Sequence, residues 1–395
     1  MIRAAMLTPN LSIGGAERWV ATLIRHSNPR ELQWTGVALS GWGGIEPALC
    51  HEIVDVAGVP IFAEKLIDKT SKKQKPTPAA VSPDCERWLT RTANIVEAVE
   101  RASVGADVLV AWGDYKYRRF IKGPDTPNKF VLVSHSSHHK THEIPPVDYC
   151  ETFLTAVSDR AKKPYLYNGN APVEVIYNGV DLDRLVPRKS RQAMRVEWNA
   201  GSRYVIGYVG RHTLEKNPGA AISAMEYLDD KHWMAVYYGN YPTGHRPAKD
   251  SLLTHYKENP VPHIQFYEPI MEVGDIYAGI DVLMLASHSE AFALTLLEGW
   301  LTETPVIATP VGSVPELQER FGELVIEVPM KPTATQLADA CTKAVSPAGA
   351  AIVARAHEVA MEHFTAEKMA SNWARYLSKI TRPDKRVRLT EVLDL

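Results

Sequence analysis

The sequence predicts an α/β protein with two doubly wound domains that face each other across a cleft. Short apolar segments rich in β-branched residues alternate with amphipathic stretches of helical periodicity along the chain. Such alternation is typical of parallel sheets that carry helices on both faces. A length of 395 residues is too great for one ordinary hydrophobic core and fits two domains.

The apolar segments give the expected strands in order. In the first half they are IRAAMLT, QWTGVALS, DVLVAWG, KFVLVSH and TFLTAVS. In the second half they are YVIGYVG, WMAVYYG, IQFYE, DVLMLAS, PVIAT and LVIEV. They follow no fixed short period, which argues against a solenoid.

A polar stretch between two expected strands marks the domain boundary. We expect an N-terminal domain over residues 1–185, a linker over residues 186–202 and a C-terminal domain over residues 203–365. The last helical stretch and the tail, residues 366–395, are expected to pack back on the first domain. The segment 64–84, rich in lysine, proline and serine, is expected to form a loop.

Composition excludes several classes of protein. A formal net charge of −2 argues against general nucleic-acid binding. No apolar run approaches the roughly 20 residues of a membrane span, and the N-terminus lacks the apolar region of a signal peptide. The four cysteines are scattered without a C-x-x-C pair, which favours the reducing cytoplasm. For the lysines of segment 64–84, peripheral contact with the inner membrane surface and contact with a charged acceptor stay open, and a solvated insertion is the favoured interpretation.

The segment SHSEAFALTLLEG, residues 287–299, carries two glutamates after an expected buried strand. We expect Glu290 in the loop and Glu298 in the first turns of the following helix. Between them, the backbone N–H groups near Leu294 and Thr295 lie at a helix N-terminus, which suits a phosphate. Carboxylates accept hydrogen bonds from sugar hydroxyls, so the spacing favours a nucleotide sugar. A helix-terminal charge plus a surface glutamate is the alternative on spacing alone.

Two further motifs fit the same ligand. GYVGRHTLEKNP places Arg211 and Lys216 on a loop after an expected strand, where two cations can neutralise a diphosphate. NLSIGGAERW places Gly14 and Gly15 in a turn before a helix, where a backbone can come close to a ligand. A solvated loop and an ordinary tight turn are the respective alternatives, and the Gly-Gly pair is not the G-x-G-x-x-G dinucleotide pattern.

The segment HSSHHKTHE contains four histidines, His135, His138, His139 and His142. Metal binding is one interpretation, but H-E-x-x-H is absent and no acidic partner is fixed. A polar loop around one functional histidine is the favoured interpretation. Asp114 and Lys116 follow a neighbouring strand, where contact with an acceptor and plain surface placement both stay open.

Together these segments resemble the GT-B glycosyltransferases, specifically the retaining family-four, group 1 type. The matching stretches are IGGAERWVATLI, VIYNGVD, GYVGRHTLEKNP and GIDVLMLASHSEAFALTLLEGWLTETPVIATPVGSVPEL. The resemblance spans most of the chain and is loose only between about residues 40 and 150. It implies two Rossmann-like domains with the nucleotide sugar held mainly by the second.

The resemblance also implies roles for individual residues. Glu298 would hold the ribose hydroxyls, and Glu290 would hold hydroxyls of the transferred sugar. The diphosphate would be bound by Arg211, Lys216 and the backbone amides near Leu294 and Thr295. From the other side of the cleft, Gly14 and Gly15 would lie against the phosphate or the acceptor, and His135 would lie near the reacting sugar.

The implied activity is retaining transfer of a hexose-type sugar from a UDP- or GDP-sugar to an unknown hydroxyl acceptor. No cofactor and no metal are expected, because the cations and the helix N-terminus stabilise the leaving diphosphate. The rival functions are a sugar-nucleotide epimerase and a non-catalytic sugar-nucleotide-binding protein of the same fold.

Three positions depart from the family pattern. Ala291 and Ala293 replace the glycines of the usual Glu-Gly-Phe-Gly, and Ser313 replaces the second glycine before Pro-Glu. Because alanine resists positive φ, we expect a tilted loop or a slightly smaller sugar pocket.

Overall fold

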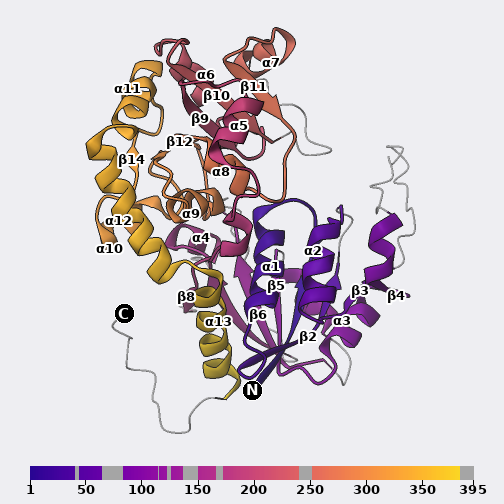
Figure 1. Ribbon diagram of the computed structural model, residues 1–395. Coiled ribbons are helices and arrows are strands. Elements are labelled where there is room, and N and C mark those ends of the chain that lie inside the picture. The colour runs from indigo at the N-terminus through magenta and orange to yellow at the C-terminus, as the bar shows by residue number, and fades with distance from the viewer. Residues whose placement is uncertain are drawn as a thin grey trace.

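The computed structural model describes residues 1–40, 44–64, 83–113, 115–121, 126–136, 150–165, 172–239 and 251–382. Within them the chain forms two sheets flanked by helices (Figure 1). All the strand pairs in both sheets are parallel. The predicted α/β class with two doubly wound units is confirmed.

The first sheet has eight strands in the order β4-β3-β2-β1-β5-β6-β7-β8. They are β1 (Ile2–Thr8), β2 (Leu32–Leu39), β3 (Ile61–Glu64), β4 (Leu89–Thr92), β5 (Val108–Trp112), β6 (Lys129–Ser134), β7 (Glu151–Ala156) and β8 (Val173–Val175). The second sheet has six strands in the order β11-β10-β9-β12-β13-β14. They are β9 (Tyr204–Val209), β10 (Trp233–Tyr238), β11 (Ile264–Tyr267), β12 (Val282–Leu285), β13 (Val306–Ala308) and β14 (Ile326–Glu327).

Helices connect the strands in the order expected for crossover units. In the first half of the chain they are α1 (Gly15–His26), α2 (Pro47–His51), α3 (Ile95–Ser103) and α4 (Asp159–Lys162), with the short π-helix η1 (Glu52–Val56) and the short 3-10 helices η2 (Pro83–Trp88), η3 (Tyr115–Phe120) and η4 (Lys163–Tyr165). The second half has α5 (Arg191–Glu197), α6 (Gly219–Met225), α7 (Ser251–Glu258), α8 (Gly274–Gly279), α9 (Leu294–Leu301), α10 (Val314–Phe321), α11 (Ala334–Ala344), α12 (Pro347–His363) and α13 (Ala366–Thr381), with η5 (Leu182–Leu185) and η6 (Leu214–Lys216).

Every expected strand is present, and three strands were not expected. These are β3, β4 and β8, which are four, four and three residues long. β4 and β8 are the edge strands of their sheet. Short edge strands carry polar residues on one side, so their sequences, LTRT and VEV, lack the continuous apolar run of a central strand.

The central strands are apolar because both of their faces are covered. In β12, Leu283 and Leu285 join one hydrophobic cluster together with residues of α9, whereas Val282 and Met284 join a second cluster with residues of α6 and α11. Successive side chains of a strand point to opposite faces, so this division shows helices on both sides of the sheet.

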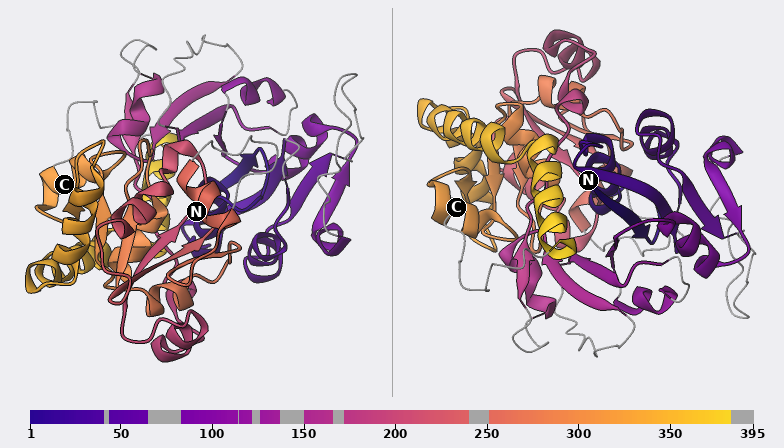
Figure 2. Two further views of the ribbon diagram at one scale, coloured as in Figure 1. Left: turned by 90° about the horizontal axis from the view of Figure 1, so that it is seen from above. Right: turned by 90° about the horizontal axis from the view of Figure 1, so that it is seen from below.

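The C-terminal helix α13 packs against α1 and β1. The rings of Trp19 and Trp373, both buried, have centroids 5.6 Å apart. Figure 2 shows α13, in yellow, beside the indigo N-terminal segment. The chain therefore returns to the first sheet after completing the second.

The connection between the sheets is tightly packed. Val180 and Thr365 form a parallel β-bridge, and a Cβ at Gly179 would collide with the Thr365 carbonyl oxygen. Within the stretch expected to be a linker, residues 191–197 form α5, which packs against α8. Part of this stretch is thus ordered against the second sheet, and the domain limits given above stay a prediction.

Candidate functional site

The loops that concern function leave the strands at the point in each sheet where the order of the strands reverses. In the second sheet this point lies between β9 and β12, and in the first it lies between β1 and β5. Open α/β sheets bind ligands outside the carboxyl ends of the strands at such a point. Arg211 follows β9, Glu290 follows β12 and Gly14 follows β1, so the structure brings the sequence motifs to these two points.

Glu290 lies in the loop between β12 and α9 and is 7% exposed. Its Oε2 accepts from Lys216 Nζ at 2.5 Å, and its Oε1 accepts from Ser287 Oγ at 2.9 Å. Burial removes a carboxylate from water, so these two donors replace part of its hydration. The glutamate and the lysine that were expected to share a ligand are thus in direct contact.

The backbone under Glu290 requires a glycine at one position only. Gly312 has φ +61°, and a Cβ there would lie 2.8 Å from Glu290 Cβ. In contrast, Ala293 has φ −81° and Ser313 has φ −83°, and Ala291 is not among the residues with positive φ. The departures from the family pattern therefore place no alanine or serine in the left-handed region, and the expected tilt of the loop stays a prediction.

The loop after β9 is attached to the Glu290 loop by several hydrogen bonds. Asn217, which has φ +46°, donates from Nδ2 to the Ala286 carbonyl at 2.9 Å. The His288 N–H donates to the Glu215 carbonyl at 2.8 Å. These bonds hold η6, which contains Lys216, beside the loop of Glu290.

Arg211 lies at the edge of this arrangement and is the accessible cation of the two. Its side chain is 49% exposed and pairs with Glu215 through a contact of 2.8 Å. Lys216, by comparison, is 22% exposed. A half-exposed guanidinium can turn toward an incoming diphosphate at little cost, because an exposed ion pair contributes only about 0–1 kcal/mol.

Glu298 lies in α9 and is 4% exposed. Arg184 Nη1 lies 3.4 Å from its Oε1, and the Tyr277 hydroxyl donates to its Oε2 at 2.9 Å. Burial, followed by the charge of Glu298, raises the pKa of Tyr277 well above its ordinary value, so the phenol keeps its proton. Neither Arg184 nor Tyr277 was singled out from the sequence. A signal was present, since Arg184 lies three residues after Asp181, the last residue of the VIYNGVD motif.

The N-terminus of α9 lies between the two glutamates. Its first residue is Leu294, as expected, and no side chain caps it. The first turn contains no acidic residue, and Leu294 and Thr295 are partly exposed. An uncapped N-terminus without a carboxylate is favourable for an anion.

The two glycines at the start of α1, the N-cap Gly14 and the first helical residue Gly15, make room for protein groups. A Cβ at Gly14 would collide with the Glu17 carboxylate, and one at Gly15 would lie 3.7 Å from Leu294 Cδ1 of the other sheet's helix α9. Burial raises the pKa of Glu17, although the charge of Arg211 opposes the shift. Gly15 and Leu294 thus face each other where the two halves meet, and Glu17 occupies the space beside Gly14.

His135 follows β6 and lies between two tryptophan rings. Its ring centroid is 4.7 Å from that of Trp19 and 5.9 Å from that of Trp112. Burial lowers its pKa to about 3, so the imidazole is neutral at physiological pH. Within the described residues, its buried Nε2 has no hydrogen-bond partner.

Metal binding finds no support in the described part of the chain, which contains no group of three or more His, Cys, Asp or Glu able to hold an ion. His138, His139, His142, Asp114 and the side chain of Lys116 lie outside the described residues, as do most of segment 64–84 and the tail after residue 382. No helix of the described part is long and apolar enough to span a bilayer.

The two halves also meet at Glu316, in the first turn of α10. Its Oε2 accepts from the backbone N–H of Asp159, in α4, at 2.7 Å. Nearby, Ser158 Oγ donates to the Ala291 carbonyl at 2.7 Å. Burial and then the negative charge of Asp159 raise the pKa of Glu316 from 4.5 to about 7.

This shift predicts a pH-dependent stability. Between pH 4.5 and about 7 the unfolded chain releases the Glu316 proton and the folded chain retains it, so the free energy of unfolding falls as the pH rises. Outside this window Glu316 contributes no slope. Glu316→Gln should flatten the fall, as measured by urea unfolding at steps from pH 4 to pH 8. Glu319→Gln, an exposed position on the same helix, is the control and should leave the slope as in the wild type. Equal slopes in wild type and Glu316→Gln would contradict the assignment.

Residues 203–346, which include Arg211, Lys216, Glu290 and Glu298, match the family model of the glycosyl transferases group 1. This segment is a group 1 glycosyltransferase domain. The group 1 domain therefore coincides with most of the second sheet and its helices.

Curated relatives match parts of the chain. A D-inositol 3-phosphate glycosyltransferase of Corynebacterium jeikeium is 28% identical over 153 residues, 36% of this chain and 36% of that protein. One of Mycobacterium tuberculosis is 26% identical over 239 residues, 58% of this chain and 44% of that protein. The matched region thus spans less than half the length of each of these relatives.

Solved structures match nearly the whole chain. Anabaena HepE in complex with UDP-glucose has a TM-score of 0.73 at 17% identity and covers 96% of this chain and 100% of its own. WaaG, a glycosyltransferase involved in lipopolysaccharide biosynthesis, has a TM-score of 0.64 at 15% identity. The match covers 97% of this chain and 100% of the WaaG chain. At these identities the likeness shows the fold, and the fold is GT-B.

Proposed function

We propose that the chain is a retaining glycosyltransferase that moves a hexose-type sugar from a nucleoside-diphosphate sugar to a hydroxyl acceptor. One observation carries the proposal. The uncapped N-terminus of α9 lies between the two buried glutamates, Glu290 and Glu298, with Arg211 and Lys216 on the adjoining loop. A nucleoside-diphosphate sugar carries a sugar on each side of its diphosphate. Each glutamate can accept hydrogen bonds from the hydroxyls of one sugar, and the helix N-terminus between them can bind the diphosphate.

The donor-binding roles are those that the resemblance to the group 1 glycosyltransferases implies, and the chemistry of the groups fits them. Glu298 accepts hydrogen bonds from the ribose, and Glu290 accepts them from the transferred sugar. The amides of Leu294 and Thr295, with Arg211 and Lys216, bind the diphosphate. Complexes of HepE with UDP and with UDP-glucose favour a UDP-sugar as the donor.

The same groups stabilise the transition state. As the anomeric C–O bond breaks, negative charge develops on the diphosphate, where fixed cations and N–H dipoles stabilise it without reorganisation. On this basis we propose a reaction that proceeds without a metal ion. The neutral imidazole of His135 supplies a hydrogen-bonding atom to the sugar, and Gly14 and Gly15 bring the first half of the chain close to the phosphate or the acceptor.

The first test is thermal stabilisation by UDP, GDP, ADP and dTDP. A ligand at 100 times its Kd adds about 2.7 kcal/mol to the free energy of unfolding, so a single matching base should raise the melting temperature clearly. If none of the four raises it, the proposed donor site is wrong.

The second test uses the sugar nucleotide of the base so identified. Transfer to a hydroxyl acceptor with the donor's anomeric configuration, measured by NMR with and without EDTA, is the expected result. An inverted product excludes retention, and loss of activity with EDTA excludes the metal-free reaction. Turnover of the donor to an epimer, or binding without transfer, favours the rival functions.

A further inference from the structure

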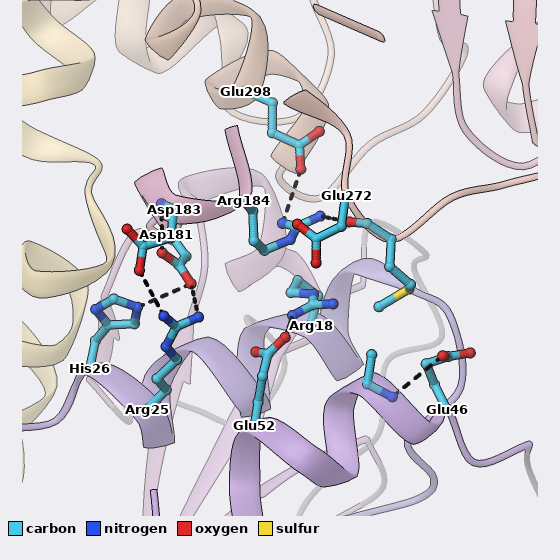
Figure 3. A network of polar contacts seen from close by, with 12 residues as sticks. Arg18, Arg25, His26, Glu46, Glu52, Asp181, Asp183, Arg184, Glu272 and Glu298 are labelled. Carbon is cyan, nitrogen blue, oxygen red and sulfur yellow. Dashed lines mark hydrogen bonds and ion pairs between the residues drawn. The ribbon is translucent and has the colours of Figure 1, made fainter. Parts of the chain in front are cut away.

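Arg184 occupies an unusual place for an arginine. It lies in η5, on the connection between the two sheets, and is buried. Its Nη1 lies 3.4 Å from Glu298 Oε1, and its Nη2 donates to the Met271 carbonyl, in the loop after β11, at 3.2 Å. Figure 3 shows the guanidinium pointing up toward Glu298 from the connecting segment. One side chain thus joins helix α9 to the loop after β11.

Arg184 and Tyr277 each contact a different oxygen of the Glu298 carboxylate. The arginine contacts Oε1, and the Tyr277 hydroxyl donates to Oε2 at 2.9 Å. Each carboxylate oxygen has two lone-pair directions, so one direction on each oxygen is left for a further donor. Two fixed acceptors side by side match the two adjacent hydroxyls of a ribose.

The first half of the chain adds a second ion pair below Arg184. Arg18, in α1, contacts Glu52 Oε1, in η1, at 2.5 Å, and both side chains are nearly buried. Figure 3 shows Arg18 and Glu52 beneath Arg184. Burial and the charge of Arg184 lower the pKa of Arg18, whereas Glu52 and Glu298 raise it. Each arginine is thus paired with one glutamate, and the charges of the two neighbouring arginines repel each other.

We propose that Arg184 is the positioning residue that makes the donor site specific for ribonucleotides. It orients the Glu298 carboxylate so that both oxygens accept from the 2′- and 3′-hydroxyls, and a 2′-deoxyribonucleotide leaves one of these acceptors unpaired in a buried site. This inference rests on the proposed function, which places the donor's ribose at Glu298.

The energetic consequence is a measurable preference. A hydrogen bond to a charged acceptor contributes about 1.5–3 kcal/mol, so loss of the 2′-hydroxyl should weaken binding about 10-fold or more in the wild type. Without Arg184, Glu298 Oε1 loses its fixed direction and the preference should fall to about threefold or less. Binding of the 2′-deoxynucleotide should change little, because it does not use the second acceptor.

The experiment compares UDP with 2′-deoxy-UDP, and GDP with 2′-deoxy-GDP, by calorimetric titration. The proteins are the wild type, Arg184→Met, Tyr277→Phe and Arg188→Met. Arg188 is an exposed arginine on the same segment, with a side chain 74% exposed, and serves as the control that should keep the wild-type preference. Melting curves without ligand report whether each variant is folded. If Arg184→Met does not fold, Arg184→Lys replaces it. Lysine keeps the positive charge but lacks the planar guanidinium, which can donate two parallel hydrogen bonds.

The outcomes separate this inference from the proposed function. Ribonucleotide preference in the wild type that disappears in Arg184→Met and Tyr277→Phe supports the inference. Equal weakening of both nucleotides in Arg184→Met, with the preference kept, overturns it and leaves the proposed donor site standing. Absence of preference in the wild type also overturns it. If the wild type binds neither UDP nor GDP, the proposed donor site fails and the inference fails with it.

Discussion

Replacing Arg211 by methionine is expected to lower kcat for sugar transfer by about 100- to 1000-fold, the range seen when one group that stabilises a developing anion is removed. The fold should be almost unaffected. The side chain is 49% exposed and its ion pair with Glu215 is at the surface, where such pairs contribute about 0–1 kcal/mol. Initial rates with saturating donor, together with melting curves, measure both effects. Lost activity in a folded protein would place Arg211 at the leaving group.

Glu215→Gln is the matched control for this prediction. It breaks the same ion pair from the other side and keeps the cation, so transfer should remain close to that of the wild type. If Glu215→Gln loses as much activity as Arg211→Met, the ion pair acts by holding the loop after β9, and the role in transition-state stabilisation is refuted. If Arg211→Met keeps full activity, the diphosphate is bound elsewhere.

Glu298→Ala is expected to weaken nucleotide binding by about 100-fold or more, because two hydrogen bonds to a charged acceptor are lost at once. Stabilisation of the folded chain by the matching nucleotide should therefore disappear from melting curves. The variant should also melt lower without ligand. Arg184 and Tyr277 would then be buried without the carboxylate that now contacts them, and unpaired buried groups are costly.

Glu298→Gln separates the two effects. The amide keeps the size and one oxygen acceptor, so the fold should be better preserved, while one of the two acceptors for the ribose becomes a donor. Affinity measured well below the melting temperature should fall in the order wild type, Glu298→Gln, Glu298→Ala. Wild-type affinity in Glu298→Ala would show that the nucleotide does not bind at this carboxylate.

Local patterns in the sequence determined the architecture and the positions of several site residues. The buried central strands are continuous apolar runs because helices cover both of their faces, and this alone predicted both sheets. The apolar run before SHSEAFALTLLEG predicted β12, and the small, polar residues that follow it predicted that α9 begins near Leu294. Loops at the carboxyl ends of parallel strands gather at one edge of a sheet, which is why the order of the motifs predicted their approximate place.

Only the tertiary structure decided which groups touch. Lys216 reaches Glu290 across 74 residues of chain, and Arg184 reaches Glu298 across 114. Glu17 lies beside Gly14, a contact that the motif NLSIGGAERW did not predict. Periodicity reports which face of an element is buried, because burial acts on each residue separately. Ion pairs and collisions depend on the relative placement of distant elements, which follows from the packing of the whole chain and leaves no pattern in the local sequence.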